Sequence, residues 1–425
     1  MKRYYTKARA LIFSSTARDT YVLFGGNVIS AFLGFIYTLV IARTLDVPNF
    51  GIFSAATNLV VILHSITDLG ISSGAVNFIA ESNAKSDEET GSKYIKASLI
   101  LRFAITFIVA FLVIIFSKYI ANTFLVTENT NIAILTAIVS LSLAVPMLFP
   151  FFLQAKKKFV PSIISDISLY LSRLVFTFSV MLLTKVTVEN SLIAFVVGGI
   201  VGTVVGAYLI KFDFLKSKPE KQIYEKLIRF SGWIGVNRII SSLSGRLDIQ
   251  MLAVMSGATA TGLYSIPSRL AGFIIVLTSS LSGVLASRLA GFGNKDKEKK
   301  YILKATLALI PITMGIIVWA MIAKPFIQLL FGENYLDSVP VFRALVLSMI
   351  PFIFTAPSVA AIIYAMKKNI YIGIYSFFQL AAIFLLNLFF IPKYGPLGPT
   401  FTFGITNTIL AIYTWAIVIR HYWSK

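Results

Sequence analysis

Long apolar runs follow one another along the whole chain, separated by short stretches rich in charge, proline, glycine or asparagine. A helix needs about 20 apolar residues to cross a bilayer. Only helices or closed barrels satisfy their backbone groups within lipid, and no alternating strand pattern is visible. We therefore expect an all-α polytopic membrane protein with twelve spans, at 21–42, 50–80, 97–117, 131–154, 161–184, 191–211, 229–255, 262–289, 302–323, 339–366, 370–391 and 397–419. The run at 50–80 contains Gly70 and Gly74, so a break is expected near its far end.

Composition supports this interpretation and removes several classes of protein. Hydrophobic residues make up 57% of the 425 positions and charged residues 13%, whereas soluble domains average about 45–50% and about 25%. A chain of this length is filled by about a dozen spans, so no soluble domain is expected beside them. Cysteine is absent, which excludes disulfides, thiolate metal sites and a cysteine nucleophile.

The net charge of +20 is explained by topology. If the N-terminus is cytoplasmic, 27 of the 38 lysines and arginines fall in short cytoplasmic segments and 6 on the opposite side. Such an asymmetry orients a membrane protein, so both termini are expected in the cytoplasm. No nucleic-acid partner is needed to explain the charge.

The two halves of the chain resemble each other at offsets of 208 to 211 residues. An even number of spans in each half predicts a parallel repeat, which is typical of transporters with a site at the interface between the halves. The matching positions are Asn27 and Asn237, Gly51 and Gly262, Lys96 and Lys304, and Lys157 and Lys367.

The repeat divides the chain into segments. We expect an N-lobe at 21–211, a cytoplasmic linker at 212–228, a C-lobe at 229–419 and a cytoplasmic tail at 420–425. Residues 1–20 carry five basic residues. They form either an interfacial segment on the anionic cytoplasmic leaflet or a disordered basic leader.

Catalytic chemistry finds no support. The chain lacks a glycine-rich phosphate loop, a nucleotide-binding motif, an HExxH motif and a nucleophile elbow. Its two histidines, His64 and His421, are far apart in sequence and have no clustered ligands. We expect no catalytic residues, no metal site and no cofactor other than a coupling ion, H⁺ or Na⁺.

Polar residues within the predicted spans are the candidate site, because a charge in lipid costs roughly 2.5–3.5 kcal/mol. On a continuous helix 229–255, one polar stripe is formed by Asn237, Ser241, Ser244 and Asp248. Because two charges join this stripe, a water-filled cavity is favoured over a packing face. On the first span the equivalent stripe begins at Asn27, and packing is favoured there. The candidate substrate-binding residues are Arg246, Arg238, Arg269, Asn237, Asp248 and Asn27.

Three other charged residues within the spans are interpreted differently. Arg102 lies close to the cytoplasmic end of its helix, so we expect it to reach the lipid headgroups. His64 and Asp68 are four positions apart and are the candidate coupling residues, since such a pair could bind or relay a proton. The alternative is that Asp68 simply ends its helix.

The segment Ala42–Gly51, ARTLDVPNFG, resembles the AR-x-L-G-x-x-x-F-G motif of polysaccharide and oligosaccharide flippases. Asp68–Ile71, Arg246–Asp248 and Gly262–Ser265 are similar to later segments of that family. The resemblance implies a member of the multidrug/oligosaccharidyl-lipid/polysaccharide exporter superfamily, with two six-helix lobes in a V around a central cavity. Asp46 replaces the usual glycine, and twelve spans depart from the fourteen typical of lipid II flippases.

We therefore expect a flippase that carries polyprenyl-(pyro)phosphate-linked oligosaccharide across the cytoplasmic membrane by alternating access, for surface polysaccharide assembly. The mostly positive charges within the spans suit an anionic lipid better than a cationic drug. The alternatives are a cation-coupled multidrug or small-solute antiporter of the same fold, and a membrane polysaccharide polymerase or ligase. Expected partners are the bilayer, the lipid-linked oligosaccharide and polysaccharide polymerase or assembly proteins.

Overall fold

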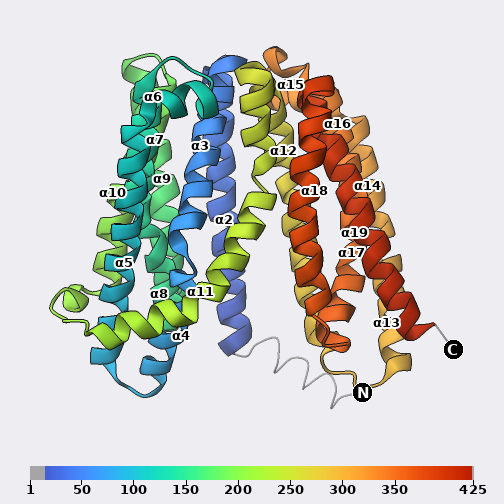
Figure 1. Ribbon diagram of the computed structural model, residues 1–425, viewed down its shortest axis with the longest axis horizontal. Helices are drawn as coiled ribbons and strands as arrows, with labels where there is room; N and C mark the ends of the chain where they lie inside the picture. The colour runs from blue at the N-terminus through green and yellow to red at the C-terminus, as the bar shows by residue number, and fades with distance from the viewer. Residues whose placement is uncertain (1–14, 424–425) are drawn as a thin grey trace. The chain divides into compact units, whose positions relative to one another are not determined.

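The computed structural model describes residues 15–423, and within this range all regular secondary structure is helical (Figure 1). The predicted all-α polytopic fold is confirmed. Most of the predicted N-terminal segment 1–20 lies outside the described residues, and its remainder is the start of a helix. The helices group by contact into two compact units, described separately below.

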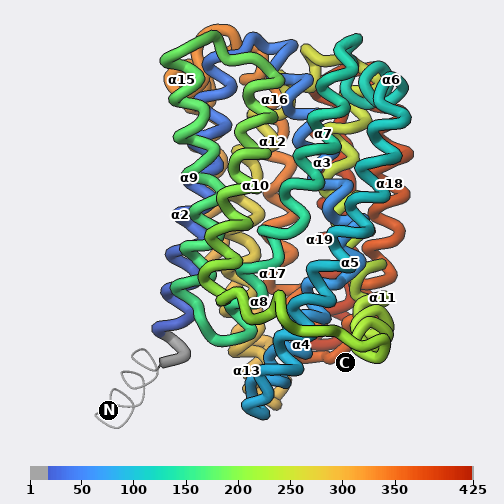
Figure 2. Tube along the Cα trace, turned by 90° about the vertical axis from the view of Figure 1, so that its left-hand side faces the viewer, coloured from blue at the N-terminus to red at the C-terminus, as the bar shows by residue number. Residues whose placement is uncertain are grey.

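Among the described residues, unit 1 comprises 15–45, 59–122 and 127–239. Figure 2 shows two of its helices, α9 and α10, side by side, and they pack closely. Aromatic side chains fill the end of the unit near α4, where Phe78 stacks on Tyr94 with ring centroids 4.7 Å apart. Its helices are α2 (Ser15–Thr44), the last part of α3 (Val47–Asp68), α4 (Ile71–Ala84), α5 (Glu88–Ile115), α6 (Ser117–Ile120), α7 (Thr130–Ala144), α8 (Phe149–Ala155), α9 (Phe159–Leu183), α10 (Val188–Ile210) and most of α11 (Lys221–Ser244).

Unit 2 comprises the described residues 46–58, 123–126 and 240–423. It contains the first part of α3 and the last turn of α11 in addition to the C-terminal helices. These are α12 (Leu247–Leu289), α13 (Lys295–Leu307), α14 (Ile310–Met321), α15 (Ala323–Phe331), α16 (Ser338–Ser348), α17 (Ile350–Ala360), α18 (Ile370–Tyr394) and α19 (Gly398–Tyr422).

The units are interleaved in sequence, whereas the predicted lobes are contiguous. Residues 229–239, expected at the start of the C-lobe, belong to unit 1, and residues 46–58, expected in the N-lobe, belong to unit 2. The lobe and linker boundaries derived from the repeat stay a prediction.

Ten of the twelve expected spans coincide with apolar helices of sufficient length, and an eleventh, 131–154, coincides in part with the bent pair α6–α7. Among the described residues, nine helices could cross a membrane, or ten if the bent pair α6–α7 counts as one span. One of these nine is the 53-residue segment Ile370–Tyr422, which contains both α18 and α19. Gly395, with φ of 53°, separates α18 from α19, and these two helices pack against each other. Each has 25 residues, or about 38 Å, so they form two spans.

The twelfth expected span, 229–255, differs from the prediction. Helix α11 ends at Ser244 and α12 begins at Leu247, so the continuous helix is wrong. Gly245 and Arg246 form the break, and Arg246 has a non-helical φ of −133°. Glycine is about 1 kcal/mol less favourable than alanine within a helix. Helix α11 has 24 residues but is not among the helices apolar enough to cross a membrane.

Two backbone distortions shape the helices next to the candidate site residues. Leu69 and Gly70 have φ of 44° and 78° and separate α3 from α4, so the break expected near Gly70 is confirmed. Helix α12 is interrupted at Gly257, whose φ of 84° suits a residue without a side chain.

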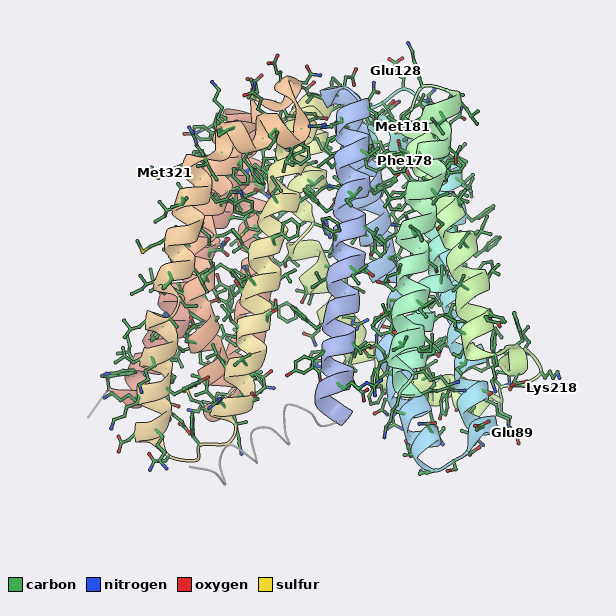
Figure 3. The ribbon with its side chains drawn as sticks, turned by 180° about the vertical axis from the view of Figure 1, so that it is seen from behind. Glu89, Glu128, Phe178, Met181, Lys218 and Met321 are labelled. Carbon is green, nitrogen blue, oxygen red and sulfur yellow. The ribbon has the colours of Figure 1, made fainter. Side chains whose placement is uncertain are left out.

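The ends of unit 1 follow the expected alternation of loops. Figure 3 shows Glu89 and Lys218 at one end of this unit and Glu128 at the other. The predicted cytoplasmic segments around residues 89 and 218 therefore share one end. The side of the membrane on which that end lies stays a prediction.

Candidate functional site

Three charged residues of unit 1, Asp68, Arg102 and Arg238, meet at the break between α3 and α4. Asp68 is the last residue of α3, and its side chain is 11% exposed. Its Oδ2 accepts hydrogen bonds from Arg238 Nη1 at 2.9 Å and from Ser72 Oγ at 2.9 Å. Arg238 Nη1 also donates to Ser72 Oγ. One buried carboxylate thus links α3, α4 and α11.

A second arginine approaches the same carboxylate from α5. Arg102 Nη1 lies 3.4 Å from Asp68 Oδ1, and Arg102 Nη2 donates to His64 Nδ1 at 2.8 Å. Arg102 is 3% exposed, so the expectation that it reaches the headgroups is wrong. Arg102 is covered because helix α4 continues past the break and packs on α5. Its pairing with Asp68 offsets part of the cost of burying the guanidinium charge.

Arg238 reaches this cluster because α11 packs closely against the break. A Cβ added to Gly70 would lie 2.5 Å from the carbonyl oxygen of Ser231. One added to Gly235 would lie 2.5 Å from the carbonyl carbon of Leu69. The two glycines bring the backbones together, and the next turn of α11 places Arg238 beside Asp68. The Arg238 side chain remains 42% exposed.

The cluster carries one positive charge in excess. A guanidinium has no acceptor, so His64 Nδ1 accepts the hydrogen bond from Arg102 and the imidazole is neutral. Arg102 and Arg238 then contribute two positive charges and Asp68 one negative charge. The excess is accessible only at Arg238, because His64, Asp68 and Arg102 are buried. The arrangement is suited to binding an anion at Arg238.

Two further predicted residues lie at the α11–α12 break in unit 2. Arg246 is exposed, and its carbonyl oxygen accepts a hydrogen bond from Asn58 Nδ2 at 3.0 Å. Asp248 is 2% exposed, and its Oδ2 accepts from the hydroxyl of Tyr264 at 2.6 Å. Because the helix breaks between Ser244 and Asp248, the predicted polar stripe is wrong beyond Ser244.

The remaining predicted residues are spread over both units. In unit 2, Arg269 is half-buried, and its Nη2 lies 3.4 Å from the hydroxyl of Thr57. In unit 1, Asn237 is exposed and donates to the Trp233 carbonyl one turn earlier. Asn27 is exposed on α2. Of the predicted site residues, the structure brings His64, Asp68 and Arg238 into one cluster.

Sequence reasoning missed two members of that cluster, Arg102 and Ser72. Ser72 follows Asp68 by four positions, a spacing that places both residues on one helical face, but the expected break concealed this signal. For Arg102, depth along the helix alone predicts a position at the headgroups. A buried partner 34 positions away leaves no local pattern in the sequence.

The comparisons with known proteins match this architecture. A model of the family described as "Polysaccharide biosynthesis protein" matches residues 16–291, which is more than half of the chain. The chain belongs to this family. Its helices of spanning length make this family member a multi-pass membrane protein.

Relatives of this family member extend over most of its length. The chain is 24% identical to a putative O-antigen transporter of Shigella flexneri over 376 residues, which is 86% of this chain and 88% of the relative. Its fold is similar to that of the lipid II flippase MurJ in an inward closed conformation, with a TM-score of 0.75 at 16% identity over 94% and 87% of the two chains. An inward-facing multidrug resistance MATE family transporter of the MOP superfamily gives 0.72 at 15% identity over 91% and 94%. The family resemblance found in the sequence is confirmed by the family match, and the solved structures share the fold.

Proposed function

We propose that this protein is a flippase for polyprenyl-(pyro)phosphate-linked oligosaccharide. The observation that carries the proposal is the family match over residues 16–291. The name of the Shigella flexneri relative, a putative O-antigen transporter, supports a saccharide cargo. The fold it shares with a lipid II flippase is compatible with moving a lipid-linked headgroup.

The charge of the candidate site suits this cargo. Helix α11 is long enough to span a bilayer but too polar to pass as an apolar span, and it carries Arg238 with a 42% exposed side chain. Arg246, just beyond its end, is also exposed. A lipid-facing arginine at membrane depth is expensive, so these side chains are best accommodated facing water. Guanidinium groups bind phosphate with charge-assisted, often bidentate hydrogen bonds.

The two carboxylates Asp68 and Asp248 do not favour the antiporter alternative. A site for a cationic drug needs an accessible negative charge, yet Asp68 is buried between two arginines. Asp248 is buried against Tyr264. A positive surplus at an exposed arginine repels a cation and attracts the phosphate of a lipid-linked sugar.

The mechanism we propose is alternating access in the cytoplasmic membrane, with both termini in the cytoplasm. The headgroup would cross while the polyprenyl chain stays in the bilayer. H⁺ or Na⁺ is the proposed coupling ion, with His64 and Asp68 as the coupling residues. Polymerase or assembly proteins that use the translocated saccharide are the proposed partners.

Reconstitution tests the function directly. The purified protein is placed in liposomes with a fluorescent lipid-linked oligosaccharide, and loss of signal to a membrane-impermeant quencher reports leaflet exchange. We expect exchange well above that of protein-free liposomes. A cationic dye in a parallel assay tests the antiporter, and mass spectrometry for new glycosidic bonds tests the polymerase or ligase. Dye transport or bond formation without lipid exchange would contradict the proposal.

A further inference from the structure

Asp68 lies between two arginines that differ in burial and in their distance from its carboxylate. Arg238 is partly exposed and lies 2.9 Å away, whereas Arg102 is buried and lies 3.4 Å away. We propose that Asp68 is an exchangeable counter-ion: a phosphate group displaces it from Arg238, and Arg102 then holds it. The inference rests on the proposed function for the identity of the ligand, an anionic phosphate headgroup. It assigns to Asp68 the role of a positioning residue whose partner depends on whether phosphate is bound.

The donors of Arg102 support the exchange. Within the described residues, Nε and Nη1 of Arg102 are buried and make no hydrogen bond. Buried polar groups are almost always paired, so such donors call for an explanation. The 3.4 Å from Nη1 to Asp68 Oδ1 exceeds the roughly 2.7–2.9 Å of a charge-assisted hydrogen bond. Arg102 is therefore in position to take the carboxylate by a small tightening of this contact.

The charges remain balanced after the exchange. A buried charge that loses its partner is strongly destabilising, but Asp68 keeps Arg102. It also keeps hydrogen bonds from Ser72, through Oγ at 2.9 Å and the backbone N–H at 3.4 Å. The buried pair Arg102–Asp68 is neutral, and the single surplus charge lies on Arg238. That residue is the member of the cluster exposed enough to meet a phosphate.

The exchange acts on a particular helix. Arg238 is one residue from the point where α11 passes from unit 1 into unit 2, between Ile239 and Ile240. Its contacts with Asp68 and Ser72 fix this part of α11 to the α3–α4 break. Phosphate binding releases that contact while the packing at Gly70 and Gly235 remains, so ligand occupancy changes one of the contacts that hold α11. A two-state contact of this kind is what coupling between a ligand and a conformational change requires.

A double-mutant cycle tests the exchange in the purified full chain in lipid nanodiscs. Binding of inorganic pyrophosphate is measured by calorimetry for the wild type, Asp68→Asn, Arg102→Gln and the double variant. Parallel titrations with polyprenyl phosphate in the nanodisc distinguish a lipid headgroup from a free anion. Size-exclusion profiles and thermal melting establish that each variant is folded.

If Asp68 changes its partner, the effects of the Asp68 and Arg102 substitutions on pyrophosphate affinity should not be additive. Asp68→Asn removes the competitor, so affinity should rise by about tenfold. Arg102→Gln should lower affinity by about tenfold while Asp68 is present, because the displaced carboxylate has no second partner. In the Asp68→Asn background, the same Arg102 change should shift affinity by less than about twofold. Equal effects in both backgrounds would indicate a simple field effect of charge and would overturn the exchange.

Further variants make the result independent of folding and of net charge. If Arg102→Gln is unstable, Arg102→Lys replaces it in the cycle, since it keeps the charge but loses the fork that would receive Asp68. Glu81→Gln removes an exposed carboxylate of the same unit that is paired with Lys85, and it should leave affinity unchanged. A rise in affinity equal to that of Asp68→Asn would overturn the exchange.

The outcomes separate this inference from the proposed function. Leaflet exchange by the wild type, together with additive effects in the double-mutant cycle, would support the flippase. The same result would overturn the proposal that Asp68 changes its arginine partner. Non-additive effects of Asp68→Asn and Arg102→Gln without leaflet exchange would support the change of partner at Asp68 and contradict the flippase. Coupling with pyrophosphate but not with polyprenyl phosphate would overturn the lipid headgroup as the displacing group. Absence of pyrophosphate binding to Asp68→Asn would overturn the site itself.

Discussion

Gly51 and Gly262 pack reciprocally, each against the backbone near the other. A Cβ on Gly51 would clash with the carbonyl oxygen of Ala258, and one on Gly262 would clash with that of Val47. Both pairs, Gly51 with Gly262 and Val47 with Ala258, are 211 positions apart in the sequence. The internal repeat therefore contributes equivalent residues to one close contact between α3 and α12, and glycine is needed on both sides of it.

The first prediction concerns this contact. Gly51→Ala or Gly262→Ala should lower the free energy of unfolding by about 1–3 kcal/mol, because a methyl group would have to displace rigid backbone. The measurement is thermal unfolding of the purified protein in one detergent. Gly272→Ala, also on α12, is the matched control, since nothing lies within 4 Å of its added Cβ. That variant should be as stable as the wild type or more so, given the helix propensity of alanine. Equal melting of all three variants would contradict the packing role.

The spans could be predicted because each is a continuous apolar run, and the cost of burying unpaired backbone in lipid leaves little choice of structure. The break at Leu69–Gly70 was likewise visible as a glycine within an apolar run. The break at Gly245–Arg246 was not predicted, since one glycine in a helix costs only about 1 kcal/mol and tertiary packing decides its effect.

The candidate site was only partly predictable for a different reason. Local spacing identified His64 and Asp68, and the cost of a charge in lipid singled out Arg238. The pairing of Arg102 with Asp68 depends on how α4 and α5 pack beyond the break. The position of a residue along a helix predicts the depth of its backbone in the membrane, but it does not predict which buried residue its side chain contacts.

The second prediction concerns topology and uses the absence of native cysteine. Single cysteines at Lys85, Lys157 and Lys218 should react with an impermeant maleimide only from the cytoplasm, because the positive-inside rule places their segments there. Single cysteines at Glu128 and Asn334 should react from outside. Labelling of intact cells and of inverted vesicles gives the two measurements. Reaction of position 218 from the outside alone would reverse the proposed orientation.

The third prediction concerns proton coupling through His64. Protonating Nδ1 would place a second positive charge 2.8 Å from Arg102, so the contact must break as the imidazole charges. If His64 carries the coupling proton, the rate of leaflet exchange should depend on pH. His64→Gln keeps an acceptor for Arg102 but does not titrate, and it should flatten this dependence. His421→Gln, the other histidine, should retain it. A wild-type profile in His64→Gln would leave His64 with a structural role alone.

The fourth prediction concerns Arg246, which the structure places at the exposed break between α11 and α12. Asn58 holds the backbone carbonyl of Arg246, so truncating the side chain leaves that contact in place. Arg246→Ala should therefore fold normally. It should slow leaflet exchange about tenfold or more, because a hydrogen bond to a charged group is worth about 1.5–3 kcal/mol. Arg246→Lys should recover only part of the rate, since lysine keeps the charge but loses bidentate geometry. Arg229→Ala, an exposed arginine earlier on α11, is the control and should transport normally. Wild-type exchange by Arg246→Ala at equal reconstitution would remove Arg246 from the substrate path.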